Sequence, residues 1–241
     1  MASIASAALD PREIIARRCA RELKDGEVVN LGIGIPTLTA NHLPADVNVI
    51  FHTENGAFGF GAKPGTLEAD SDVTNAGCEP VTLRPGAAIM DLATSLGAMR
   101  NGYIDVTVLG ALEVDQLGNL ANWACRRNGR WWPGIGGAMD LCYGARKVVA
   151  ALQHTGKGGE SKIKRKCALP LTGRGCIKVI VTDKAVFGVG IGVLVLREAL
   201  PGLTVDDIRV LTEADFTVAD DFRPMDLGLA PARPLAVAAP A

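Results

Sequence analysis

The order strand, glycine turn, helix, strand is compressed into residues 27–52, and it constrains the fold more than any other feature of the chain. The first strand is "EVVNL", the turn holds Gly32 and Gly34, and a helix begins at Pro36, a residue suited to a first helical turn. The second strand is "DVNVIFH", which ends at His52. This spacing is that of a βαβ unit, whose two strands run parallel in one sheet. The chain is therefore predicted to be an α/β protein.

Further helices and strands continue this pattern. A helix is predicted over residues 10–25, because Asp10 can cap it, Pro11 suits its first position, Glu13 completes a capping box and Gly26 ends it. Two more helices are expected, over residues 92–100 and 204–211, the second with a capping box of Thr204 and Asp207. Strands are expected at "VTLRPG", "IDVTVLGALEV", "KVVAALQH" and "IKVIVTD".

These elements predict one domain over residues 1–222, with a mostly parallel central sheet flanked by helices. No repeat of 20–50 residues divides the chain. Residues 223–241 are rich in proline and alanine, and we expect them to form a disordered tail.

Composition excludes several classes of protein. Charged residues are 21% of the 241 and the net charge is −1, so neither nucleic acid nor a membrane surface is expected as a partner. No apolar run reaches the roughly 20 residues of a membrane span. The six cysteines form no C-x-x-C pair, which predicts reduced thiols and a cytoplasmic protein. The three histidines lack metal-ligand spacing, so no metal is expected.

Two glycine motifs and one basic run have simple explanations. "LGIGIPT" lacks the third glycine of a dinucleotide fingerprint, because Pro36 follows Gly34 and Ile35, and a tight turn explains it on this evidence, although its glycines would let a ligand approach. "GVGIGV" at 188–193 lies between two apolar runs and predicts a hairpin turn. The basic run "KIKRK" at 162–166 predicts a solvated loop, with a role in attracting a phosphorylated ligand left open.

The carboxylate of Glu54 is the candidate for chemistry. A glutamate in a loop is most often just solvated. Glu54, however, follows an apolar strand, at the carboxyl end where α/β proteins place their sites, and it opens the glycine-rich run "ENGAFGFG". An ionised carboxylate can act as a covalent nucleophile, and we expect the glycines to leave space for a bulky substrate. A Gly56→Val variant is therefore expected to fold but to turn over slowly.

The chain resembles the B (beta) subunits of the 3-oxoacid CoA-transferases. Colinear motifs carry this resemblance over nearly all of residues 10–217: "VNLGIGIPTL", "TENGAFGFG", "NAGCEPVTLRPGAA", "GYIDVTVLGALEVDQLGNLANW", "GIGGAMDL", "KCALPLTG" and "VTDKAVF". The resemblance implies a single CoA-transferase-type domain with Glu54 as the nucleophile.

The same resemblance implies roles for other residues around Glu54. The Gly137 N–H would contribute to an oxyanion hole, Asn122 would lie near the active site, and Asn55 and Gly56 would contribute to substrate binding. Gly32 and Gly34 would form a turn near the bound ligand or a partner subunit.

The implied reaction moves CoA from an acyl-CoA donor, succinyl-CoA, to a 3-oxoacid through a covalent glutamyl-CoA thioester. Coenzyme A esters would be substrates, with no tightly bound cofactor, and a homologous A (alpha) subunit would complete an α2β2 heterotetramer, so the chain alone would be inactive. Two alternatives stay open: a hydrolase, acting on acyl-CoA or cleaving a ring, and a non-catalytic module that binds CoA esters or sugar phosphates.

The segment "ACRRNGRWWP" at 124–133 departs from the common members of this family. It leads directly to the glycines before Gly137, so it either reshapes the acceptor pocket or forms a surface excursion. Arg126, Arg127 and Arg130 in this segment would pair the second carboxylate of a dicarboxylic acceptor, or they would simply face water.

Overall fold

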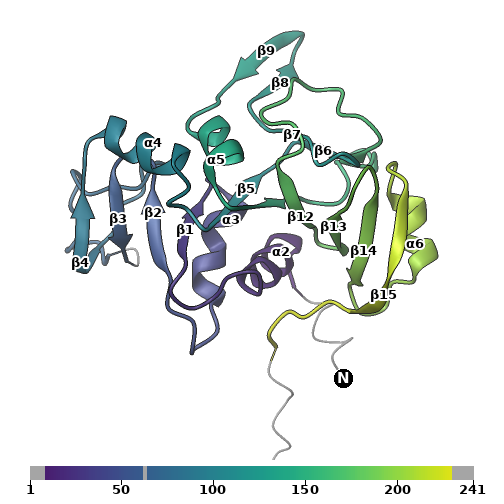
Figure 1. Ribbon diagram of the computed structural model, residues 1–241, viewed down its shortest axis with the longest axis horizontal. Coiled ribbons are helices and arrows are strands. Elements are labelled where there is room, and N and C mark those ends of the chain that lie inside the picture. Colours follow the sequence, from purple (N-terminus) through teal and green to yellow (C-terminus); the bar gives the residue numbers. More distant parts are fainter. Residues whose placement is uncertain (1–8, 62–63, 230–241) are drawn as a thin grey trace, which may run out of the picture.

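A ten-stranded sheet forms the centre of the protein in the computed structural model, which describes residues 9–61 and 64–229 (Figure 1). The strand order is β15-β14-β13-β12-β10-β5-β1-β2-β3-β4. The strands of this sheet are β1 (Val28–Leu31), β2 (Ile50–Thr53), β3 (Ala57–Phe60), β4 (Leu83–Ile89), β5 (Val106–Gly110), β10 (Lys147–Ala151), β12 (Ile177–Val181), β13 (Ala185–Val189), β14 (Leu194–Ala199) and β15 (Phe216–Pro224).

Smaller sheets and short helices surround it. The remaining strands are β6 (Glu113–Asp115), β7 (Leu120–Ala121), β8 (Ala124–Arg127), β9 (Arg130–Pro133) and β11 (Ile163–Lys164). The helices are α2 (Pro11–Ala20), α3 (Ile35–Leu38), the 3-10 helix η1 (Thr39–His42), α4 (Leu92–Arg100), α5 (Ala138–Gly144) and α6 (Val205–Leu211). In the described part of the chain, no helix combines the length and apolar character needed to cross a membrane.

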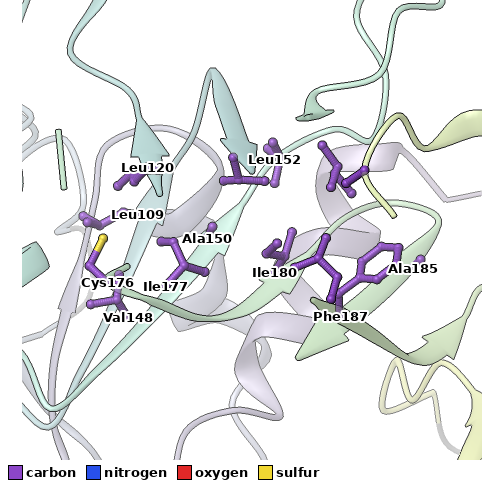
Figure 2. Packing of buried hydrophobic residues seen from close by; sticks show 14 of the residues in the cluster. Leu109, Leu120, Val148, Ala150, Leu152, Cys176, Ile177, Ile180, Ala185 and Phe187 are labelled. Carbon is purple, nitrogen blue, oxygen red and sulfur yellow. The ribbon is translucent and has the colours of Figure 1, made fainter. Parts of the chain in front are cut away.

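The middle of the sheet is parallel, because β2, β1, β5, β10 and β12 all run in one direction. Its strands are buried on both faces. In β10, Val148 and Ala150 pack into one apolar cluster, while Val149 and Ala151 pack into the other. Figure 2 shows the first of these clusters. The predicted α/β class and βαβ unit are confirmed.

The two ends of the sheet contain antiparallel pairs. The predicted hairpin turn at 188–193 joins the antiparallel strands β13 and β14. At the other end, the segment after Glu54 is not the open loop that we expected: residues 57–60 form β3, which pairs antiparallel with β2 and with β4. Glu54 therefore lies at a tight strand-to-strand turn.

The helix caps agree with the sequence in part. Thr204 and Asp207 form the predicted capping box at α6. Asp10 caps α2, but its carboxylate accepts a hydrogen bond from the Arg12 N–H, so the expected capping box with Glu13 is wrong. The Glu13 side chain binds Arg17 and His42 instead.

The folded chain continues past the domain boundary expected at residue 222. β15 runs to Pro224, and beyond it Met225 and Leu227 are buried in the cluster beneath α2. Apolar burial of this kind explains why the chain stays ordered here despite its proline and alanine content. Residues 230–241, which make up most of the expected tail, lie outside the described residues.

A buried ion pair joins the two ends of the chain. Arg18 of α2 donates to both carboxylate oxygens of Glu198 on β14, at 2.6 and 3.1 Å. Arg223 of β15 donates to the same carboxylate at 2.8 Å. The side chain of Glu198 is 1% exposed and that of Arg18 is 6% exposed, so neither charge is solvated by water. Each charge therefore depends on its partner.

We predict that Glu198→Ala lowers the free energy of unfolding by about 3–5 kcal/mol, because it leaves the Arg18 guanidinium buried without its main partner. Urea denaturation monitored by circular dichroism measures this loss. The matched control is Asp221→Ala, since Asp221 also pairs with Arg223 but is 80% exposed. Equal effects of the two substitutions would contradict the prediction.

Candidate active site

Glu54 lies directly after β2, where the chain turns into β3. Its side chain is partly buried, and one carboxylate oxygen, Oε1, accepts a hydrogen bond of 3.2 Å from the backbone N–H of Gly137. Gly137 precedes the first residue of α5, so its N–H is one of those left without an acceptor inside the helix. The structure thus brings the predicted nucleophile and the predicted oxyanion donor into contact.

Glycine is required at the backbone that faces this carboxylate. A Cβ atom on Gly137 would lie 3.1 Å from Glu54 Cδ and 3.0 Å from Met99 Cε, tighter than ordinary contact distances. A Cβ atom on Gly136 would lie 3.1 Å from Glu54 Oε1, and Gly136 has a φ of +50°. These glycines allow the carboxylate to lie directly against the backbone.

The glycines that follow Glu54 have a different role from the one that we expected. Gly56 has a φ of +124°, and a Cβ atom on it would overlap the carbonyl oxygen of Met90. Gly59 faces Ala87 of β4 in the same way, at 3.2 Å. These positions are occupied by the neighbouring backbone and not by space for a substrate. The expectation that Gly56→Val folds normally is therefore wrong.

Thr53 and Asn55 hold the turn around Glu54. The Thr53 hydroxyl accepts a hydrogen bond from the Ala76 N–H and donates to Asn55 Oδ1, at 2.9 and 2.8 Å. The Asn55 amide donates to the Thr74 carbonyl at 2.9 Å. The side chain of Asn55 thus ties the turn to the segment that contains Thr74 and Ala76.

A buried polar chain that the sequence analysis missed supports the strand before Glu54. The Asn30 amide lies 3.2 Å from His52 Nδ1, and His52 Nε2 lies 2.9 Å from Ser95 Oγ. Because an amide nitrogen can only donate, Nδ1 is the acceptor and Nε2 carries the ring proton. Burial lowers the pKa of His52 to about 4, so the ring is neutral at pH 7. Two polar residues inside otherwise apolar strands were the available signal.

A pocket of about 710 Å³ opens beside Glu54, at the carboxyl ends of β1, β2, β5 and β10. Gly32 and Asn122, both predicted from the sequence, line it together with Glu54. Asn122 is fixed there, because its amide donates to the Gly110 carbonyl at 3.0 Å and its oxygen accepts from Thr172 at 2.6 Å. The remaining predicted residues, Gly34, Asn55, Gly56 and Gly137, are not part of the pocket lining.

The departing segment 124–133 forms the hairpin β8–β9, which projects from the body of the protein (Figure 1). The Arg126 guanidinium stacks over Trp131 at 5.3 Å, and the Trp131 ring is exposed. Arg126, Arg127 and Arg130 are not part of the pocket lining. Gly34, the other glycine of the predicted turn, has a φ of +93° and precedes the short helix α3. Across residues 9–61 and 64–229, no group of three His, Cys, Asp or Glu side chains is arranged to hold a metal ion.

Comparison with known proteins gives consistent matches. The profile of the coenzyme A transferase family matches residues 12–211. The beta subunit of the acetate CoA-transferase of Haemophilus influenzae is 47% identical over 91% of this chain and 97% of its own length. The B chain of the two-subunit succinyl-CoA:3-ketoacid coenzyme A transferase of Helicobacter pylori is 45% identical over 86% of this chain and 99% of its own length.

Solved structures confirm the fold. An Escherichia coli O157:H7 acyl-CoA transferase, in a thioester complex with CoA, superposes with a TM-score of 0.71 at 24% identity. The match covers 91% of this chain but only 44% of that one, so the present chain corresponds to less than half of the E. coli transferase chain.

We predict that Gly56→Ala destabilises the protein by roughly 2–6 kcal/mol, through strain at positive φ and overlap with the Met90 carbonyl. Gly97→Ala is the matched control: it makes the same chemical change inside α4, where the added Cβ atom meets nothing within 4 Å. Thermal and urea unfolding of both variants measure the difference. If Gly56→Ala were as stable as Gly97→Ala, the packing explanation of Gly56 would fail.

Proposed function

The chain belongs to the coenzyme A transferase family, as a B (beta) subunit, and we propose that it transfers CoA from an acyl-CoA to a 3-oxoacid through a thioester on Glu54. One observation carries the proposal: the Glu54 carboxylate rests against a glycine backbone and accepts a hydrogen bond from the Gly137 N–H inside a substrate-sized pocket. A carboxylate that only faced solvent would not need this environment.

In the first half of the reaction, a Glu54 carboxylate oxygen attacks the thioester carbonyl carbon of the donor. The carbon–sulfur bond breaks, CoA leaves as a thiolate, and a mixed anhydride joins Glu54 to the donor acyl group. The thiolate then attacks Cδ of Glu54, the donor acid leaves as a carboxylate, and a glutamyl-CoA thioester remains.

In the second half, the carboxylate of the acceptor attacks Cδ of the glutamyl thioester and displaces the CoA thiolate. The thiolate attacks the acceptor's acyl carbon in the new anhydride, which yields acceptor-CoA and returns Glu54 as a carboxylate. No proton is gained or lost over the cycle, so the reaction does not require a general acid, and the neutral, buried His52 is not needed as one.

Gly137 stabilises the steps that occur at Cδ. Its N–H already contacts Oε1, which is the atom that carries negative charge when Cδ becomes tetrahedral. The donor is thus aligned before the reaction, and loss of one such donor typically slows a reaction on the order of 10²–10³-fold.

For the substrates, we propose succinyl-CoA as the donor and a 3-oxoacid as the acceptor, as in the name of the H. pylori relative. The H. influenzae relative, named for acetate, makes acetate the first competing acid to test.

For assembly, we propose a homologous A subunit in an α2β2 heterotetramer in the cytoplasm. The names of both relatives, each given as one subunit of a transferase, support the need for a second one. So does the E. coli chain, of which this chain matches 44%.

We predict that this chain, co-expressed with its A subunit, becomes covalently modified at Glu54 on incubation with succinyl-CoA. Borohydride reduces a glutamyl thioester to an alcohol, and peptide mass spectrometry then locates the reduced side chain. Glu54→Gln keeps the size of the side chain but removes the nucleophile, so it should show neither the adduct nor transferase activity.

Two other results would contradict the covalent mechanism. Thiol release without any acceptor acid would mean that water intercepts the intermediate, as in a hydrolase. Binding of CoA esters with no adduct in an intact complex would mean a module that only binds them.

We also predict that the isolated chain has no transferase activity and that addition of the A subunit restores it. Size-exclusion chromatography with light scattering, run beside the assay, measures the mass of the active species. Full activity from the isolated chain would refute the need for a partner.

A further inference from the structure

We propose that Lys162 is a binding residue for a negatively charged group of the substrate inside the Glu54 pocket. This inference rests on the proposed function, since it supplies a role in substrate recognition at the same site. The group is an anionic oxygen cluster, either the free carboxylate of a dicarboxylic acyl group or a phosphate of CoA.

The main chain of Lys162 is fixed at the edge of the pocket. Its N–H donates to the His154 carbonyl at 3.0 Å, and its carbonyl accepts from the Val114 N–H at 3.1 Å. His154 follows β10 and Val114 lies in β6, so Lys162 is held between the segments that leave two central strands. Its side chain is partly buried and lines the pocket. A side chain held in this way is not simply part of a solvated loop.

The rest of the basic run is already occupied. Lys164 pairs with Glu213 at 2.9 Å, and Arg165 pairs with Asp215 at 3.1 Å. Lys162 forms no ion pair within 4.0 Å with any carboxylate of the described chain. The run that the sequence predicted as one solvated loop therefore contains one ammonium that is available to a ligand.

The charges of the pocket require such a group. Its lining contains two carboxylates, Glu54 and Glu79, and Lys162 is the one lysine or arginine among the lining residues. Every substrate of the proposed reaction is an anion, and a third negative charge beside two carboxylates is repelled at short range. An ammonium in the same pocket offsets that repulsion and orients the substrate.

Lys162 also takes over a role that the sequence analysis gave to arginines. The hairpin arginines were expected to pair a second carboxylate, but Arg126 stacks on Trp131 and none of the three lines the pocket. Lys162 approaches from the β10 side, and Glu54 from the β2 side. Three strand spacings separate these strands, about 14 Å at the sheet, so the two side chains flank the pocket and leave room for a ligand between them.

The experiment compares Lys162→Met with Lys166→Met in the complex that this chain forms with its A subunit. Lys166 belongs to the same run and is not part of the pocket lining, so both variants remove one charge and only the first removes it from the site. Lys162→Arg keeps the charge and serves as the conservative variant. For each protein, kcat/KM is measured with succinyl-CoA and with acetyl-CoA, which share CoA and differ in the acyl carboxylate.

Removal of the contact is expected to lower kcat/KM about 10- to 100-fold, the effect of losing one charge-assisted hydrogen bond. A loss restricted to succinyl-CoA identifies the acyl carboxylate as the ligand. An equal loss with both esters identifies a CoA phosphate. Lys162→Arg should recover most of the loss, and Lys166→Met should change neither rate. Unchanged rates in Lys162→Met would overturn the proposal.

Calorimetric titration separates this inference from the proposed function. CoA and succinate are titrated into the wild-type complex and into Lys162→Met, which requires no turnover. If the complex binds these anions and transfers no CoA, the proposed function fails while the Lys162 contact is still tested by its effect on the Kd. Equal Kd values for the two proteins would again refute the role of Lys162.

Discussion

The site depends on the parallel alignment of four central strands. β2, β1, β5 and β10 run in one direction, so their carboxyl ends meet at one edge of the sheet, and the pocket lies at that edge. The alignment is stable because the strands are buried on both faces: alternate residues of β10 fill two different apolar clusters. A slip of one residue would exchange those two faces, so the core fixes the register and the register fixes the site.

Within this frame, the environment of the Glu54 carboxylate is built from segments far apart in the chain. β2 leads into Glu54, the turn before α5 supplies Gly136 and the Gly137 N–H, and the segment after β5 supplies Asn122. The buried, neutral His52 and its partners Asn30 and Ser95 hold β2 against β1 and α4. Rigid strands and glycine backbone thus position one carboxylate at the edge of the pocket.

Local patterns were sufficient for much of the fold. Apolar runs, capping residues and turn glycines predicted most of the central strands, α4, α6 and the hairpin between β13 and β14. The same patterns missed α5 and the β8–β9 hairpin, and they did not predict that residues 57–60 would pair as β3. Glycine-rich and polar stretches carry little periodic signal, and tertiary contacts decided their conformation.

The sequence by itself determined the α/β class, and through its resemblance to a known family it singled out Glu54 and Gly137. Only the tertiary structure decided what each glycine does, because Gly56 and Gly137 differ in their neighbours: the Met90 backbone at one and the Glu54 carboxylate at the other. It likewise decided which member of the run 162–166 remains available to a ligand, since ion pairing with Glu213 and Asp215 depends on contacts across the fold. Distances between distant residues are set by packing, and no local pattern records them.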